Sequence, residues 1–294
     1  MSSKQVTLYA PIVHAAPSDR EITLQKQLDR KFEPRLEKQV EEKMHQRELS
    51  DAQHRTGIFF PDSYVPGPKL DLIVYFHGLL DRCDGSGSDT VKEYWTNKHF
   101  RLRELVNDAK KNVVLVVPRL GAMDKTGSKL GMEGDDFLTK VAAAVADRVK
   151  TDPFNWNGSM TIRNIILAAH SGGGWTMLRL AQKVTVGKVL ECWGFDSMYQ
   201  LPQEWVNWAA TGGKYFLFWT SEGGINSDHY GNNVDKMNKI LNNTKDATSA
   251  LAAPNIVVEY TPKPKTFSKA TTEHCDVPKT YFPDLITRKD NGLS

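Results

Sequence analysis

Apolar, β-branched runs that alternate with helix-length segments constrain the fold of this chain more than any other feature. The runs lie at 70–76, 113–117, 162–168, 188–193, 214–219 and 256–260. Segments with helical spacing separate most of them, at 99–110, 135–150, 173–184, 203–210 and 233–245. Strands that are apolar along their whole length are buried on both faces. The pattern therefore predicts an α/β fold with a mainly parallel, twisted sheet and helices on both faces. Shorter strand candidates at 5–9 and 57–60 predict an antiparallel edge.

The N-terminal part of the chain has a different composition. Residues 19–56 are rich in Glu, Lys, Arg and Gln, and apolar residues recur every four positions from 24 to 44. This spacing predicts a charged helical arm, which Pro34 would kink or divide in two. We therefore expect an N-terminal segment, 1–56, followed by an α/β domain, 57–294. A surface helix packed on the domain is the simpler interpretation, and an arm that joins subunits of a homo-oligomer is the alternative.

Charge and hydropathy exclude several classes of partner. The net charge of +3 and the lack of a basic cluster predict no nucleic-acid partner. No apolar stretch has the length of a transmembrane segment, and the N-terminus does not read as a secretory signal. The sequence thus predicts a soluble protein, cytoplasmic by default, although its localisation stays unknown. The three cysteines form no CxxC pair and are expected to be isolated thiols.

One serine stands between a predicted strand and a predicted helix. The sequence there is Ala169-His170-Ser171-Gly172-Gly173, which departs from the nucleophile-elbow pattern G-x-S-x-G by one alanine in place of the first glycine. Small residues on both sides allow a tight turn that lifts the hydroxyl clear of the sheet. The helix that follows directs free N–H groups at the same point, where they favour negative charge. Ser171 is therefore the predicted nucleophile, with a structural turn as the alternative.

Acyl transfer also needs N–H donors for an oxyanion. The N–H of Gly172 directly follows the serine, and a second donor normally comes from the loop after an earlier strand. His77-Gly78-Leu79 occupies that place after the run 70–76. The Leu79 N–H is the predicted second donor, and Gly78 lets the chain turn closely.

A serine hydroxyl is a poor nucleophile without an adjacent base. Of the eight histidines, His274 and His229 compete for this role. His274 lies beyond the last predicted strand, where the chain order serine, acid, histidine expects it. His229 precedes the last predicted helix, one element too early. We favour His274.

Two carboxylates compete as the acid that orients the imidazole. Asp196 follows the run 188–193 in a tight turn, and Glu222 follows the next run, 214–219, before two glycines. Asp is the shorter and better ordered side chain, so Asp196 is favoured and Glu222 is the alternative.

Further residues near the predicted strand ends are expected to line a substrate pocket: His77, Gly78, His170 and Trp175. No metal or cofactor is predicted. The acidic loop from Asp81 to Asp89 could offer oxygen ligands, but its spacing fails the calcium-loop template.

These motifs make residues 57–282 resemble the α/β-hydrolase superfamily of serine hydrolases. In that superfamily the acid usually follows the strand where Glu222 lies, whereas a minority place it where Asp196 lies. The resemblance implies the fold and acyl-transfer chemistry, but it does not imply a substrate, because this fold hosts many functions. From the residues we expect a cofactor-free hydrolase that acts on an ester of a small molecule, glycan or lipid. A carboxylesterase is the favoured function. The alternatives are an amidase or peptidase with the same triad, and a non-catalytic binding protein on the same fold.

Overall fold

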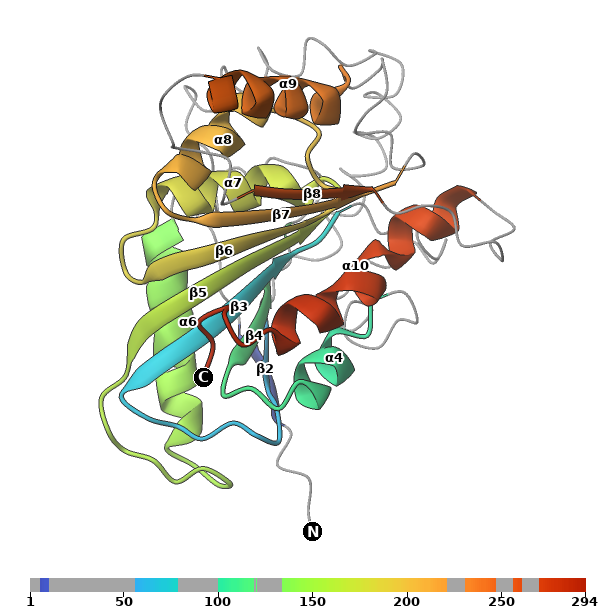
Figure 1. The fold of residues 1–294 in the computed structure, drawn as a ribbon. Helices are drawn as coiled ribbons and strands as arrows, with labels where there is room; N and C mark the ends of the chain where they lie inside the picture. The colour runs from blue at the N-terminus through green and yellow to red at the C-terminus, as the bar shows by residue number, and fades with distance from the viewer. Residues whose placement is uncertain are drawn as a thin grey trace, which may run out of the picture.

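A mainly parallel eight-stranded sheet forms the centre of the molecule (Figure 1). The computed structural model describes residues 6–10, 56–78, 100–118, 120, 134–220, 231–246, 256–260 and 270–294. The charged arm at 19–56 lies outside them except for Thr56. The strands are β1 Val6–Ala10, β2 Thr56–Phe60, β3 Lys69–Phe76, β4 Val114–Pro118, β5 Thr161–His170, β6 Lys188–Phe195, β7 Lys214–Trp219 and β8 Ile256–Tyr260. All eight predicted strands are present.

The strand order is β1-β2-β4-β3-β5-β6-β7-β8. β2 runs antiparallel to both β1 and β4, which confirms the predicted antiparallel edge, and the pairs from β4 to β8 are parallel. Because β1 pairs with β2, the first strand of the N-terminal segment joins the sheet of the α/β domain.

Helices cover both faces of the sheet, as the sequence predicts. Figure 1 shows α4 and α10 on one side and α6, α7, α8 and α9 on the other. Their bounds are α4 Leu102–Asp108, α6 Gly134–Val149, α7 Gly173–Lys183, α8 Pro202–Ala210, α9 Asn233–Asp246 and α10 Ala270–Thr287. The structure thus has the predicted α/β fold, a mainly parallel sheet with helices on both faces. α10 was not among the predicted helices, because Pro278 and Pro283 lie inside it and proline usually breaks a helix.

Two apolar cores form because successive strand residues point to opposite faces. On β5, Ile165, Leu167 and Ala169 join the core under α6 and α7, whereas Ile166 and Ala168 join the core under α4 and α10. The carboxyl-terminal parts of β3, β5 and β6, which lie between the cores, are buried. The sheet is therefore a rigid platform, and side chains at its carboxyl edge have fixed positions.

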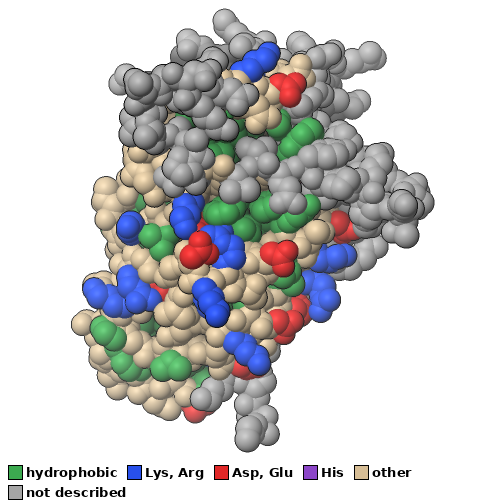
Figure 2. Space-filling view, viewed as in Figure 1, with side chains coloured by type: hydrophobic (Ala, Val, Ile, Leu, Met, Phe, Trp, Pro, Cys, Tyr) green, Lys and Arg blue, Asp and Glu red, His purple; other side chains and the backbone are tan. Residues whose placement is uncertain are grey.

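The visible surface carries charges of both signs. Figure 2 shows Lys and Arg side chains interspersed with Asp and Glu over the described part of this face. Among the helices in the described ranges, none combines the length and apolar character that a membrane span requires.

Candidate active site

Ser171 lies on a strained turn at the carboxyl edge of the sheet. β5 ends at His170 and α7 begins at Gly173, so the serine occupies the corner between them. Its φ is 51°, in the left-handed region that non-glycine residues rarely adopt. Its N–H donates to the Phe195 carbonyl at 3.1 Å, and its carbonyl accepts from Gly174 N–H at 3.2 Å. Strain of this kind persists where the surroundings impose it, and it is concentrated at functional sites.

Close packing explains two of the glycines around this turn, Gly78 and Gly174. A Cβ on Gly78 would stand 2.3 Å from Ser171 Cβ, and one on Gly174 would stand 1.9 Å from the Ser197 carbonyl oxygen. Both distances are impossible for real atoms. The end of β3 therefore lies directly against the serine, and the first turn of α7 packs against the chain that follows β6.

Asp196 and His274 form a buried hydrogen bond. His274 Nδ1 lies 2.8 Å from Asp196 Oδ2, and the two residues are 7% and 0% exposed. A carboxylate only accepts, so Nδ1 carries the proton and Nε2 is left as the basic nitrogen. Asp196 also has a positive φ, 49°, directly after β6. The arrangement holds the imidazole in the tautomer that a general base requires.

Thr220 supplies a second donor to the same carboxylate. Its hydroxyl donates to Asp196 Oδ2 at 2.8 Å, and its N–H lies 3.4 Å from Oδ1. The residue follows β7, which pairs with β6, and it is 1% exposed. Sequence reasoning did not find Thr220. The rule that points to the carboxyl ends of neighbouring strands could have found it.

The strand register brings these residues to one edge. Phe76 pairs with Ala169, His170 with Phe195, and Phe195 with Phe218. Ser171, Asp196 and Thr220 therefore follow strand ends that lie side by side. His274 reaches the same edge from α10, rather than from a loop after the last strand.

The remaining predicted residues have the following places. His77 accepts from Leu120 N–H at Nε2, at 2.9 Å, so its Nδ1 carries the proton and donates to the Gly78 carbonyl at 2.8 Å. Trp175 lies on α7 and is half-buried, with the Arg179 guanidinium 4.3 Å from its ring centroid. His170 is buried beside His274. Leu79, Glu222 and His229 lie outside the described residues, as does the loop from Asp81 to Asp89.

Two cysteines have different states. Cys192 is a free thiol inside the sheet, and burial raises its pKa well above the ordinary value. Cys275 is disulfide-bonded, so the expectation of isolated thiols is wrong for this residue. A disulfide next to His274 was not predictable, since the position of three cysteines in a sequence does not reveal which of them meet.

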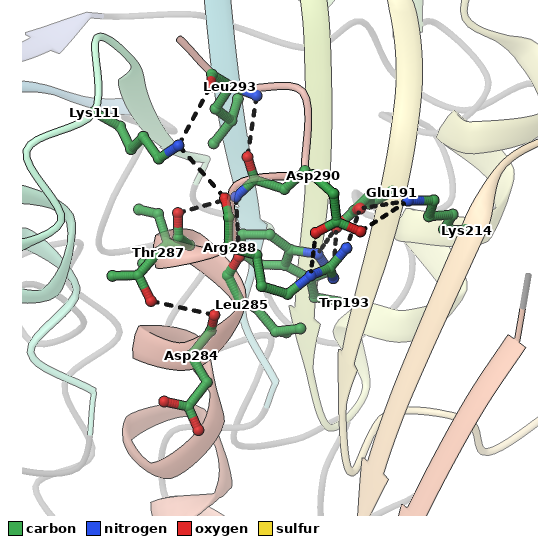
Figure 3. Close-up of polar contacts among 12 residues, drawn as sticks. Lys111, Glu191, Trp193, Lys214, Asp284, Leu285, Thr287, Arg288, Asp290 and Leu293 are labelled. Carbon is green, nitrogen blue, oxygen red and sulfur yellow. Dashed lines mark hydrogen bonds and ion pairs between the residues drawn. The ribbon is translucent and has the colours of Figure 1, made fainter.

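The far end of α10 is anchored to the strand that precedes Asp196. Figure 3 shows Arg288, just after the helix, directed at Glu191 of β6. The Arg288 Nη2 to Glu191 Oε1 distance is 2.9 Å, and Trp193 Nε1 donates to Glu191 Oε2 at 2.8 Å. α10 is thus tied to β6 at both ends, which fixes the position of His274.

Comparison of the sequence with known protein families found no matching family model, and comparison with curated proteins found no relative. The search of solved structures found similar folds. The feruloyl esterase module from Clostridium thermocellum has 13% identity and a TM-score of 0.46, over 77% of this chain and 82% of that one. An S-formylglutathione hydrolase from Agrobacterium tumefaciens has 11% identity and a TM-score of 0.41, over 79% and 90%. A poly(3-hydroxybutyrate) depolymerase from Bordetella parapertussis has 11% identity and a TM-score of 0.45, over 79% and 84%.

Proposed function

We propose that this protein is a serine hydrolase that cleaves carboxylic esters through an acyl-enzyme on Ser171. The observation that carries the proposal is the buried pair of His274 Nδ1 and Asp196 Oδ2, 2.8 Å apart. It lies at the same edge of the sheet as a serine on a strained turn before a helix. A nucleophile, a base and an orienting acid at one edge are the parts that acyl transfer requires.

In the proposed reaction, Ser171 Oγ attacks the ester carbonyl while His274 Nε2 accepts its proton. Asp196 stabilises the imidazolium that forms and stays ionised. The N–H of Gly172, at the start of α7, and that of Leu79 would bind the oxyanion, each donor worth about 10²–10³-fold in rate. The imidazolium then protonates the leaving alcohol. Water, deprotonated by the same nitrogen, releases the acid and regenerates Ser171.

A panel of p-nitrophenyl esters of increasing acyl length tests this proposal. The wild-type chain should hydrolyse at least the short esters, and Ser171→Ala should lower kcat by about 10⁴-fold or more. Ser197→Ala is the matched control, because Ser197 is also a serine beside α7 but its buried hydroxyl lies toward Tyr215 and Gly194. Equal rates for wild type and Ser171→Ala would contradict the proposal.

Ester and amide cleavage use the same residues and differ in the leaving group, which must be protonated more completely in an amide. Matched p-nitrophenyl ester and p-nitroanilide substrates of one acyl group separate the two activities. We expect kcat/KM to favour the ester. Turnover of neither substrate would support the alternative of a non-catalytic binding protein.

A further inference from the structure

His170, the residue before the candidate nucleophile, faces the helix that carries the candidate base. Side chains of β5 alternate, and Ile166 and Ala168 point toward α4 and α10. Because every second residue of a strand points to the same face, the side chain of His170 also points toward α4 and α10. Its ring centroid lies 4.4 Å from that of His274 and 5.5 Å from that of Phe100, and the residue is 1% exposed. It is therefore packed behind the base.

Pro278 leaves the main-chain carbonyl of His274 without its helical partner. In an α-helix the N–H of each residue donates to the carbonyl four positions earlier, and proline has no N–H. Pro278 stands four positions after His274 inside α10. His274 is buried, and a buried carbonyl without a donor is costly.

His170 supplies the missing donor. Its Nε2 lies 2.9 Å from the His274 carbonyl oxygen. A carbonyl only accepts, so Nε2 carries a proton and donates. His274 is thus held at two points: its ring by Asp196, and its main chain by His170.

We infer that His170 is a positioning residue for the proposed hydrolase. It donates a hydrogen bond to the His274 main-chain carbonyl, which has no helical donor because residue 278 is proline, and this bond fixes the direction of the His274 imidazole. The inference rests on the proposed function. If the inference holds, position 170, the variable position of the elbow pattern, requires a side chain with a hydrogen-bond donor that reaches as far as histidine Nε2. Displacement of a catalytic group by about 1 Å can lower a rate by about 10²-fold, so the donor should act on kcat.

Three substitutions at this position separate the donor from the ring. In His170→Gln the side-chain amide nitrogen reaches the place of histidine Nε2. In His170→Asn the shorter side chain brings the amide nitrogen only to the place of Nδ1. His170→Phe keeps an aromatic ring but has no donor. For the best ester, we expect kcat to fall about 10–100-fold in the Phe and Asn variants, while KM stays within about twofold of the wild-type value. In the Gln variant, kcat should stay within about threefold of wild type.

Proton NMR supplies a readout that general destabilisation does not move. The Nδ1–H of His274, bonded to Asp196, should give a low-field resonance in the wild type and in His170→Gln. In the Phe and Asn variants this resonance should shift or broaden, because the imidazole is no longer held in one direction. Leu138→Ala, in the core under α6 on the other face of the sheet, is the control: it should lower the unfolding temperature and leave the resonance unchanged.

A double-mutant cycle with Pro278→Ala tests whether His170 is needed because Pro278 provides no N–H for the His274 carbonyl. Alanine at 278 restores an N–H that can donate to the His274 carbonyl, so the donor of residue 170 becomes redundant. The loss of kcat caused by His170→Phe, about 10–100-fold in the wild-type background, should then shrink to about threefold or less. His170→Asn replaces the Phe variant in the cycle if the latter does not fold.

Three results would overturn the inference: wild-type kcat in both the Phe and Asn variants, an equal loss in the Gln variant, or the same penalty in the Pro278→Ala background. An inactive wild-type chain is a different result, which refutes the proposed function itself. The wild-type rate is therefore measured first, in the same assay.

Discussion

Two buried carboxylates, Glu191 within β6 and Asp196 directly after it, have opposite kinds of partner. Glu191 is 1% exposed and faces the Arg288 guanidinium at 2.9 Å and Lys214 Nζ at 3.9 Å. Asp196 is fully buried. Within the described part of the chain, its carboxylate accepts hydrogen bonds from the His274 imidazole and from the hydroxyl and N–H of Thr220, and none of these donors carries a fixed charge. The first carboxylate is paired with fixed positive charge, and the second with an imidazole and the groups of a threonine.

The difference separates an anchor from the candidate acid–base pair. Arg288 stays protonated at all ordinary pH values, so it offers Glu191 a permanent positive charge and serves to hold the end of α10. The His274 imidazole has a second ring nitrogen that can accept a proton from a reacting group, so its bond to Asp196 can support proton transfer. Both pairs join α10 to β6. The Arg288–Glu191 pair holds the helix in the place where His274 meets Asp196.

Substitution of Asp196 should give the largest effect and act on rate. Asp196→Asn keeps the shape of the side chain but lets the imidazole adopt the wrong tautomer, so kcat for a p-nitrophenyl ester should fall about 10⁴-fold. The free energy of unfolding, from urea denaturation, should change less than in the Arg288 variant below. A kcat within tenfold of wild type would show that Asp196 does not orient the base.

Substitution of Arg288 should act on stability instead. Arg288→Met keeps the aliphatic stem over Phe216 but leaves Glu191 buried without its close cation, which costs about 3–5 kcal/mol of unfolding free energy. Turnover per folded molecule should remain near the wild-type value at low temperature. A loss of kcat as large as that of Asp196→Asn, without a loss of stability, would remove the distinction between the two carboxylates.

The loss of unfolding free energy caused by Arg288→Met should also depend on pH. Burial raises the pKa of Glu191, while Trp193, Arg288 and Lys214 oppose the shift. Loss of Arg288 raises that pKa further, so the folded variant binds the proton more tightly than its unfolded chain does. Its stability is then greatest at acid pH and falls as pH rises through the raised pKa. The deficit relative to wild type should therefore be smaller near pH 5 than at pH 7, as measured by urea denaturation at both values.

Asp290 gives the smallest expected effect. A hydrogen bond from Arg288 lowers its pKa from 3.8 to about 2, but the carboxylate is exposed. Its contribution is present above the unfolded pKa of 3.8 and is lost as pH falls toward 2. Asp290→Asn should cost less than about 1 kcal/mol at pH 7, and salt should reduce it further. A cost equal to that of Arg288→Met would mean that Asp290, rather than Glu191, is the anchor.

Local sequence patterns predict the sheet, most helices and the turn at Ser171, because these features depend on residues close together in the chain. α10 was missed for a physical reason. A proline in a helix is costly when a carbonyl loses its donor, and here His170, distant in sequence, replaces the donor for His274. Thr220 was missed similarly, since only the pairing of β6 with β7 brings it to Asp196. Contacts made by register and packing across the sheet are absent from any single stretch of sequence.

Covalent labelling tests the central claim, nucleophilic Ser171, most directly. The full-length chain is treated with a fluorophosphonate, digested, and mapped by mass spectrometry. We predict a single adduct on Ser171, absent from Ser171→Ala and formed far more slowly in Asp196→Asn. An adduct on another residue, or labelling that persists in Ser171→Ala, would contradict the account.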